Sequence, residues 1–279
     1  MIGLVLGGGA AKGYAHIGVL KFLEELKIKP DIIVGASMGS LIGGFYAKGF
    51  SAQKLEEIAL QIDKRKKKEL FRFHISKKGF IDGKNVVKFL KSYLGDTKIE
   101  ELPVRYAALA TDIEENAEVV IDRGELVQAI RSSIAIPIVL TPNKYCGRIL
   151  IDGGFVSPVP VDVAINLGAK KVIAVNVLQR FEYPQIKISY KDESKKKYNI
   201  KDIFNKTFDL ISSRLIEYDV KQLKNGVWID IDTTGIGLSQ FEKAKETIDR
   251  GYHQAKKFKE QLLHLSPTYE VGEKTPEIS

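Results

Sequence analysis

The chain has 279 residues, 44% apolar and 28% charged, so it is long enough to bury a large core and lies at the upper end for one domain. No run of eighteen or more apolar residues and no cleavable signal pattern is present, which excludes a hydrophobic membrane span and leads us to expect a soluble, cytoplasmic protein. The net charge of +8, from 43 basic and 35 acidic residues, indicates an anionic partner without distinguishing nucleic acid from a membrane.

Short β-branched runs alternate with amphipathic segments along the chain. This pattern is typical of an α/β protein in which helices cover a sheet with substantial parallel character. The predicted strands are 3–6, 32–34, 106–111, 118–121, 149–151, 172–177 and 227–231. The predicted helices begin near Gly13 and then cover 38–47, 52–62, 84–94, 125–133, 161–167, 202–224 and 241–263.

The segment Leu6–Gly13 (Leu-Gly-Gly-Gly-Ala-Ala-Lys-Gly) joins the first predicted strand to the first predicted helix. Its glycines permit a tight turn and close backbone approach, and the N–H groups at a helix start can bind a negatively charged oxygen. The alternative is a dinucleotide-binding fingerprint. Against it, Ala10 stands where the second glycine is required, and no acidic residue clearly closes a second strand at the expected distance.

A second turn, Gly35-Ala36-Ser37-Met38-Gly39, follows the apolar run 32–34 and precedes a segment that can form a helix. This is the context of a nucleophile elbow, in which small neighbours let a sharp turn project the serine oxygen at a helix N-terminus. Ser37 is therefore a candidate nucleophile. The alternative is a Gly-Ser-Gly turn that only caps a helix.

Two stretches rich in lysine and aromatic residues, 64–80 and 180–198, interrupt the alternating pattern. We interpret both as basic surface insertions rather than linkers between domains. No internal repeat and no clean domain boundary is visible. We therefore expect one α/β domain, of which residues 179–279 are the C-terminal part.

A third motif, Asp152-Gly153-Gly154, ends the predicted strand 149–151. Open α/β sheets bind ligands beyond the carboxyl ends of their strands, and the two glycines leave room beside the Asp152 carboxylate. The alternative, an aspartate that only stabilises a turn, is the commoner case for an isolated motif.

In this order, the glycine-rich loop ending in Lys12-Gly13, the Gly-x-Ser-x-Gly elbow and Asp-Gly-Gly resemble the patatin-like phospholipases. The resemblance spans roughly residues 1 to 178 and includes Arg131–Pro137. It implies a three-layer fold with a central, mostly parallel sheet flanked by helices, and a catalytic core over residues 1–178. The sequence departs from the family pattern at Ala10, which we expect to serve in the loop if its φ is negative.

The resemblance implies that Ser37 is the nucleophile and Asp152 the general base, in an elbow flanked by Gly35 and Gly39 and an acid motif completed by Gly153 and Gly154. It assigns the oxyanion hole to the loop residues Gly8, Gly9, Ala10 and Lys12, with N–H groups near Gly9 and Ala10 as donors and Lys12 as a nearby positive charge. The reaction is hydrolysis of a lipid acyl ester through an acyl-serine, without metal or cofactor. A free aspartate has a pKa of about 3.9, so we expect burial of Asp152 to raise its pKa.

The order Ser37, Asp152, His253 also permits the triad used by α/β-hydrolases. We favour the dyad because 249–255 has the pattern of an amphipathic helix interior rather than a loop. The other histidines, His16, His74 and His264, are scattered, and His16 is interpreted as a packed or capping residue. The one cysteine, Cys146, is expected to be a small buried residue.

Two alternatives to a lipid hydrolase remain open. An acyl-serine can pass its acyl group to an alcohol other than water, which would make the protein an acyltransferase. The basic runs 64–68 and 195–197 fit a module that binds nucleic acid or a membrane, and nucleic acid ranks last because no recognised nucleic-acid motif is present. We expect peripheral contact with the inner membrane surface through Lys64–Phe80, where aromatic and basic residues alternate. The oligomeric state is open.

Overall fold

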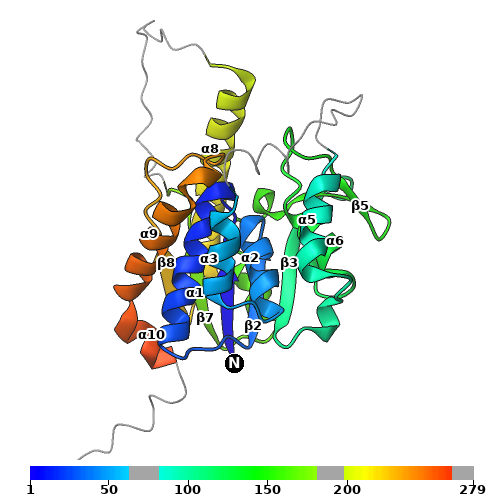
Figure 1. The fold of residues 1–279 in the computed structure, drawn as a ribbon. Helices are drawn as coiled ribbons and strands as arrows, with labels where there is room; N and C mark the ends of the chain where they lie inside the picture. Colours follow the sequence, from blue (N-terminus) through cyan, green and yellow to red (C-terminus); the bar gives the residue numbers. More distant parts are fainter. Residues whose placement is uncertain (63–81, 181–197, 266–279) are drawn as a thin grey trace, which may run out of the picture.

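A sheet of eight strands forms the centre of the computed structural model, which describes residues 1–62, 82–180 and 198–265 (Figure 1). Five strands are parallel neighbours in the order β3, β2, β1, β7, β8, as crossover connections require. Their bounds are Ile2–Leu6 (β1), Ile32–Ala36 (β2), Arg105–Asp112 (β3), Lys171–Asn176 (β7) and Gly226–Asp230 (β8). The expectation of an α/β protein with a mostly parallel sheet is confirmed.

Three antiparallel strands complete the sheet beside β3. They are β4 (Ala117–Ile121), β5 (Asn143–Tyr145) and β6 (Arg148–Asp152). β4 pairs with residues 108–112 of β3, β2 pairs with residues 105–109, and β6 pairs with residues 110–112. A strand has two edges, and the β3 residues paired with β4 overlap those paired with β2 and those paired with β6. β2 and β6 therefore share the other edge of β3, where the last residue of each strand lies beside that of the other.

Helices cover both faces of the sheet, as Figure 1 shows with α1, α2 and α3 in front of the strands. The larger core cluster joins the sheet to α1 (Ala15–Glu25), α2 (Met38–Ala47), α3 (Ala52–Leu60), α5 (Lys84–Leu94), α6 (Leu126–Ser133), α9 (Ala244–Lys256) and α10 (Lys259–Leu265). The smaller cluster joins the other face to α7 (Val161–Asn166) and α8 (Ile200–Gln222). The buried strands therefore form the middle of three layers.

Two glycines let α1 and α9 cross at very close range. A Cβ added to Gly18 would lie 2.0 Å from the carbonyl oxygen of Ile248, and one added to Gly251 would lie 2.0 Å from that of Ala15. Only a residue without a Cβ fits at such distances. This crossing packs α9 tightly against α1.

One predicted helix and one short strand differ from the sequence-based expectation. The helix predicted over 241–263 is divided into a short 3₁₀ helix η4 (Phe241–Lys243), α9 and α10, with a turn at Lys257–Phe258 that buries Leu262 and Leu265. The short strand β5 was not predicted, because its three residues lack the apolar alternation of a buried strand. The first helix begins near Gly13 as predicted, since the 3₁₀ helix η1 (Ala10–Tyr14) leads directly into α1 at Ala15.

Cys146 is exposed, contrary to the expectation that it is buried. It forms with Gly147 the two-residue connection of the β5–β6 hairpin, since Tyr145 pairs with Arg148. Both residues have positive φ, 48° and 77°, as a type I′ turn requires. The turn geometry places the thiol in solvent.

The predictions for Lys64–Phe80 and for His74 fall outside the described residues. Of the stretch 180–198, only Arg180 and Tyr198 are described. Within the described ranges, no helix combines the length and apolar character needed to cross a bilayer.

Candidate active site

Ser37 occupies a sharp turn between β2 and α2, with φ 53° and ψ −123°. A non-glycine residue in this region carries strain, which is retained here because the surroundings fix the turn. An added Cβ on Gly39 would lie 1.9 Å from the Leu6 carbonyl oxygen, and one on Gly35 would lie 2.4 Å from the Ser40 nitrogen. The two glycines of the motif are therefore required by contact distance.

The Ser37 hydroxyl donates a hydrogen bond to Asp152 Oδ2 at 2.5 Å. Both side chains are buried, and Oδ1 of Asp152 accepts the Gly154 N–H at 2.8 Å. Burial raises the pKa of Asp152 to about 7, and the bonds from Ser37 and Gly154 oppose that rise. Two further contacts hold the pair: the Ser37 N–H donates to Ser133 Oγ, and Thr111 Oγ1 donates to the Asp152 carbonyl.

Sheet register explains why residues 115 positions apart meet. Ala36, the last residue of β2, lies opposite Leu109, and Asp152, the last residue of β6, lies opposite Ala110. The two strands approach each other end to end along one edge of β3. Ser37 and Asp152 therefore reach the same point from opposite directions.

The glycine loop between β1 and α1 lies beside this pair, since a Cβ on Gly8 would be 3.3 Å from that of Ser37. Four of its N–H groups donate to carbonyl oxygens: Gly7 to Val175, Gly8 to Pro158, Ala11 to Leu238 and Lys12 to Gly9. The N–H groups of Gly9 and Ala10 have no acceptor among the described residues. Both residues line the same cavity as Ser37.

Ala10 has a φ of 47°, so the condition of a negative φ, under which alanine was expected to serve in this loop, is not met. The left-handed region costs an L-residue roughly 1–2 kcal/mol relative to glycine, which adopts it freely. This cost explains why the glycine-rich loop motif has a glycine at this position. The loop keeps its shape with alanine because Ala11 and Lys12, the next two residues, are anchored through their N–H groups.

The Lys12 side chain is buried and does not line the cavity that contains Ser37. Burial lowers the pKa of Lys12, while the nearby Asp209 carboxylate of α8 opposes that change. Its charge thus lies behind the glycine loop, between the loop and α8.

His16 supports the glycine loop from the core side. Its Nε2 lies 2.7 Å from the Gly7 carbonyl oxygen, and burial lowers the pKa of the imidazole to about 4. The neutral ring therefore donates its Nε2–H to Gly7 at neutral pH. The interpretation of His16 as a packed residue is confirmed.

Asp219 of α8 supports the loop from the other side, and no sequence motif pointed to this residue. Its carboxylate accepts hydrogen bonds from Ser157 Oγ and the Val159 N–H, each at 2.9 Å. Pro158, between them, accepts the Gly8 N–H. Burial raises the pKa of Asp219 to about 7.

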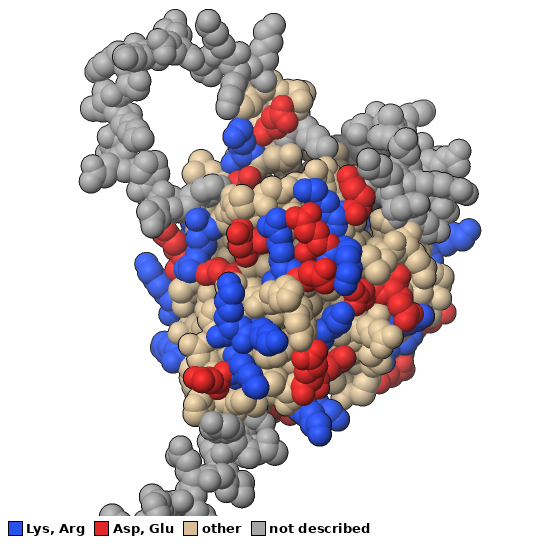
Figure 2. Space-filling model, turned by 60° about the vertical axis from the view of Figure 1, so that its left-hand side comes forward, with Lys and Arg blue, Asp and Glu red and all other residues tan. Residues whose placement is uncertain are grey.

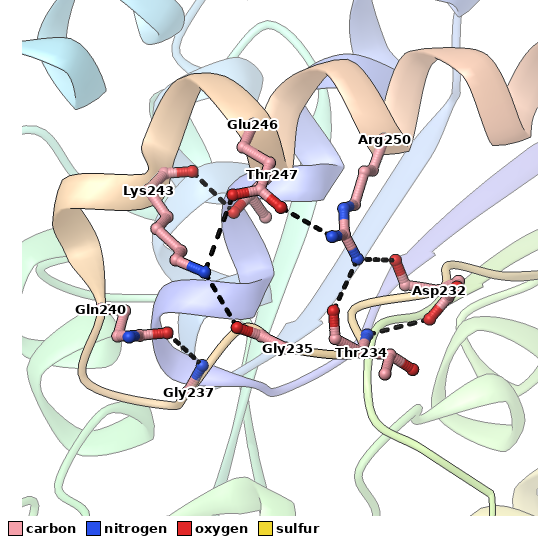
Figure 3. Close-up of polar contacts among 9 residues, drawn as sticks. All are labelled: Asp232, Thr234, Gly235, Gly237, Gln240, Lys243, Glu246, Thr247 and Arg250. Atoms are coloured by element: carbon pink, nitrogen blue, oxygen red, sulfur yellow. Dashed lines mark hydrogen bonds and ion pairs between the residues drawn. The ribbon is translucent and has the colours of Figure 1, made fainter.

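The segment 232–240 holds the loop from a third side and is itself fixed by α9 (Figure 3). Arg250 donates to the carbonyl oxygens of Asp232 and Thr234 at 3.1 and 2.8 Å. Leu238, later in the segment, accepts the Ala11 N–H. Helix α9 thereby contributes to the position of the glycine loop, although it carries no motif residue.

Ser37 lines a partly open apolar cavity of about 310 Å³. Its walls come from the glycine loop and η1, from α1, α2, α3 and α5, from the segment after α6, from α8 and from the segment before α9. The polar side chains in these walls are those of Ser37, Asn205, Ser239 and Tyr14. The remaining side chains are apolar or aromatic, and the glycine loop contributes its backbone. The cavity therefore suits a hydrocarbon chain whose reactive end lies at Ser37.

No histidine in the described part of the chain lines this cavity. His253 lies on α9 at a separate surface depression with Asp232, Asp249 and Lys257. His264 lies on α10. Across residues 1–62, 82–180 and 198–265, no three His, Cys, Asp or Glu side chains gather as a metal site would require.

Basic and acidic side chains are interspersed on the face shown in Figure 2. Many are paired, as Lys21 and Lys245 are with Glu56. A nucleic-acid surface is expected to present one sign of charge over an extended area. This face does not have that character.

A family model described as patatin-like phospholipase matches residues 4–165. Among curated proteins, an uncharacterized NTE family protein of Mycobacterium tuberculosis is 37% identical over 179 residues, which are 63% of this chain and 49% of that protein. Lysophospholipase NTE1 of Scheffersomyces stipitis is 33% identical, over 63% of this chain and 12% of its own length. The chain spans about half the length of the first of these relatives and far less of the second.

The human patatin-like phospholipase domain-containing protein 6 is 35% identical over 183 residues, which are 63% of this chain and 13% of that protein. Among solved structures, VipD of Legionella pneumophila aligns over 95% of this chain and 67% of its own, with 14% identity and a TM-score of 0.49.

Proposed function

The chain belongs to the patatin-like phospholipase family, and we propose that it hydrolyses acyl esters of phospholipids or lysophospholipids through an acyl-enzyme on a Ser37–Asp152 dyad. The observation that carries this proposal is the 2.5 Å hydrogen bond between Ser37 Oγ and the buried Asp152 carboxylate, at the end of an apolar cavity. The family match supports the lipid substrate class.

In the first half-reaction, Asp152 accepts the Ser37 proton while Oγ attacks the ester carbonyl carbon. The carbonyl electron pair moves onto its oxygen, and the N–H groups of Gly9 and Ala10 stabilise that oxyanion. Each such donor contributes on the order of 3 kcal/mol. When the intermediate collapses, the bond to the leaving alkoxide breaks and Asp152 returns the proton to it, leaving acyl-Ser37.

In the second half-reaction, water takes the place of the leaving alcohol. Asp152 removes a proton from the water as it attacks the acyl carbon, the same two N–H groups hold the oxyanion, and the proton returns to Ser37 Oγ as the fatty acid leaves. Gly8 and Lys12, whose N–H groups bond elsewhere, shape the loop rather than donate to the oxyanion. Lys12 adds a positive charge behind it.

The products test this proposal. A total lipid extract incubated with the protein should yield free fatty acid together with the deacylated phospholipid, measured by lipid mass spectrometry. An added alcohol acceptor separates hydrolysis from acyl transfer, because a transferase would convert the acceptor to an ester in preference to releasing fatty acid. If neither free fatty acid nor a deacylated lipid formed from any phospholipid or lysophospholipid, the proposal would be refuted.

The pKa of Asp152 predicts the pH dependence. A general base must be ionised, so lowering the pH through about 7 should protonate Asp152 and decrease kcat/KM tenfold for each further pH unit. Above that range kcat/KM should level off. Initial rates on a soluble short-chain ester measure the profile without interference from vesicle ionisation. A rate that stays constant from pH 5 to 8 would contradict the assignment of Asp152 as base.

A further inference from the structure

Helix α8 carries a row of apolar side chains in solvent. Figure 1 shows the start of this helix extending beyond the rest of the described fold, at the end of the molecule where the parallel strands finish. The exposed apolar residues are Ile200 (76% exposed), Ile203 (55%), Leu210 (57%), Ile211 and Tyr218. Positions 200, 203, 207, 211, 214 and 218 are spaced by three or four residues and therefore follow one side of the helix. Ile200, Ile203, Ile211 and Tyr218 stand at four of these positions, and Leu210 directly precedes Ile211.

The charges of α8 are also distributed unequally. Among its described side chains, the exposed charged residues are all basic: Lys206, Arg214 and Lys221. The acidic residues Asp202, Asp209 and Glu217 are partly buried, and Asp219 is buried. The solvent side of the helix therefore combines apolar and positively charged groups, the composition of helices that lie at an anionic membrane surface.

A neighbouring side of the same helix contributes to the proposed active site. Phe204 and Phe208 of α8 line the cavity that contains Ser37, and they pack against Phe155, which follows the Asp152-Gly-Gly motif. Phe204 follows the exposed Ile200 by four residues and Phe208 precedes the exposed Ile211 by three, so the exposed row borders the cavity wall on the helix surface. A lipid that contacts the row is thus one side chain away from the cavity.

A second exposed apolar group flanks the cavity in the segment after α6. Ile138 is 50% exposed and its neighbour Val139 lines the cavity together with Ile136. Ile138 also has a φ of 70°, which is unusual for a β-branched residue. Two elements that line the cavity therefore both present apolar residues to solvent.

From these observations we infer that the exposed row of α8 docks on an anionic phospholipid surface and brings the cavity mouth to the bilayer. Apolar residues of the row enter the acyl boundary, and Lys206, Arg214 and Lys221 contact the head groups. One acyl chain can then pass from the bilayer into the cavity along Phe204 and Phe208. The inference rests on the proposed function, because the phospholipid surface it names is the source of the proposed substrate.

The test measures vesicle binding in a Ser37→Ala background, so that no lipid is consumed. Binding to phosphatidylglycerol vesicles and to phosphatidylcholine vesicles is compared by co-sedimentation. The triple variant Ile200→Ser, Ile203→Ser, Leu210→Ser and the double variant Lys206→Glu, Arg214→Glu should each bind phosphatidylglycerol vesicles about tenfold more weakly or worse. The parent should prefer phosphatidylglycerol, and the charge-reversed variant should lose that preference.

The control is the double variant Ile165→Ser, Lys170→Glu, which changes an exposed isoleucine and an exposed lysine just before β7, at the end of the sheet where the parallel strands begin. It should bind as the parent does. With Ser37 present, all variants should hydrolyse a soluble short-chain ester at the parental rate, which shows that they are folded, while hydrolysis of vesicle lipid falls with binding.

Parental vesicle binding by the α8 triple variant would overturn the inference. A row that instead holds a second copy of the chain would appear as a dimer in sedimentation that the triple variant dissociates, with vesicle binding unchanged. If no ester is hydrolysed by the parent but its vesicle binding still depends on α8, the proposed function fails while the docking surface stands.

Discussion

Replacing Asp152 with asparagine should lower kcat on a soluble ester by about a thousandfold, a barrier increase of roughly 4 kcal/mol. Asparagine has nearly the same shape and can still accept the Gly154 N–H, but its amide cannot take the proton of Ser37. The measurement is kcat and KM for the purified variant. KM should change little, because Asp152 contacts the nucleophile and does not line the apolar cavity that we propose holds the acyl chain.

Histidine variants provide the matched controls for Asp152→Asn. In a triad the aspartate only orients a histidine, and loss of that histidine costs several orders of magnitude. His253→Gln and His264→Gln should each retain kcat within about tenfold, because neither residue lines the cavity of Ser37. A thousandfold loss in His253→Gln, with Asp152→Asn only mildly impaired, would instead make the protein an α/β-hydrolase variant.

His16→Gln is expected to behave in the same way as the other histidine variants, although His16 contacts the glycine loop. A glutamine amide can still donate to the Gly7 carbonyl, and the loop is also anchored by Pro158 and Leu238. A change within about tenfold in kcat is therefore expected.

Replacing Ser37 with alanine should remove hydrolysis altogether, with kcat lower by about 10⁴ or more, because no acyl-enzyme can form. The fold should be retained. The Ser37 contact to Ser133 uses the backbone N–H, which alanine keeps, and the turn is held by Gly35 and Gly39. Rates on a soluble ester and the circular dichroism melting curve measure the two properties separately.

The control for Ser37→Ala is Ser92→Ala, at an exposed serine on α5 whose hydroxyl only donates to a backbone carbonyl of its own helix. It should hydrolyse the ester at the parental rate. Substantial activity remaining in Ser37→Ala would remove the acyl-serine from the mechanism.

The motifs that could be read from the sequence are those in which local structure and chemistry coincide. Gly35–Gly39 and Asp152–Gly154 each stand at the end of an apolar strand, where open α/β sheets bind their ligands. The sequence could therefore indicate both residues. It could not predict that β6 meets β2 end to end on β3, since strand pairing depends on contacts far apart along the chain.

The residues that hold the site were not predictable for the same reason. Ser133, Asp219 and Arg250 are ordinary polar residues within helices, and only tertiary packing brings them to the elbow and the glycine loop. Local backbone geometry produced the other errors. Positive φ at Ala10 and Cys146 follows from the loop and hairpin that contain them, and neither residue type favours that region.

The basic stretch Lys64–Phe80 was expected to contact the membrane, and it lies outside the described residues. That expectation stays a prediction. Reversing the charges of Lys66, Lys67 and Lys68 should lower vesicle binding but spare hydrolysis of a soluble ester, and unchanged binding would favour a solvated charged surface.

The central claim is that Ser37 is the activated nucleophile, and labelling with a fluorophosphonate probe tests it most directly. The probe should modify Ser37, located by mass spectrometry of the digested protein, and the reaction should slow strongly in Asp152→Asn because the base is missing. Ser37→Ala should remain unlabelled. Modification of another serine, or undiminished labelling of the Ser37→Ala protein, would contradict the account.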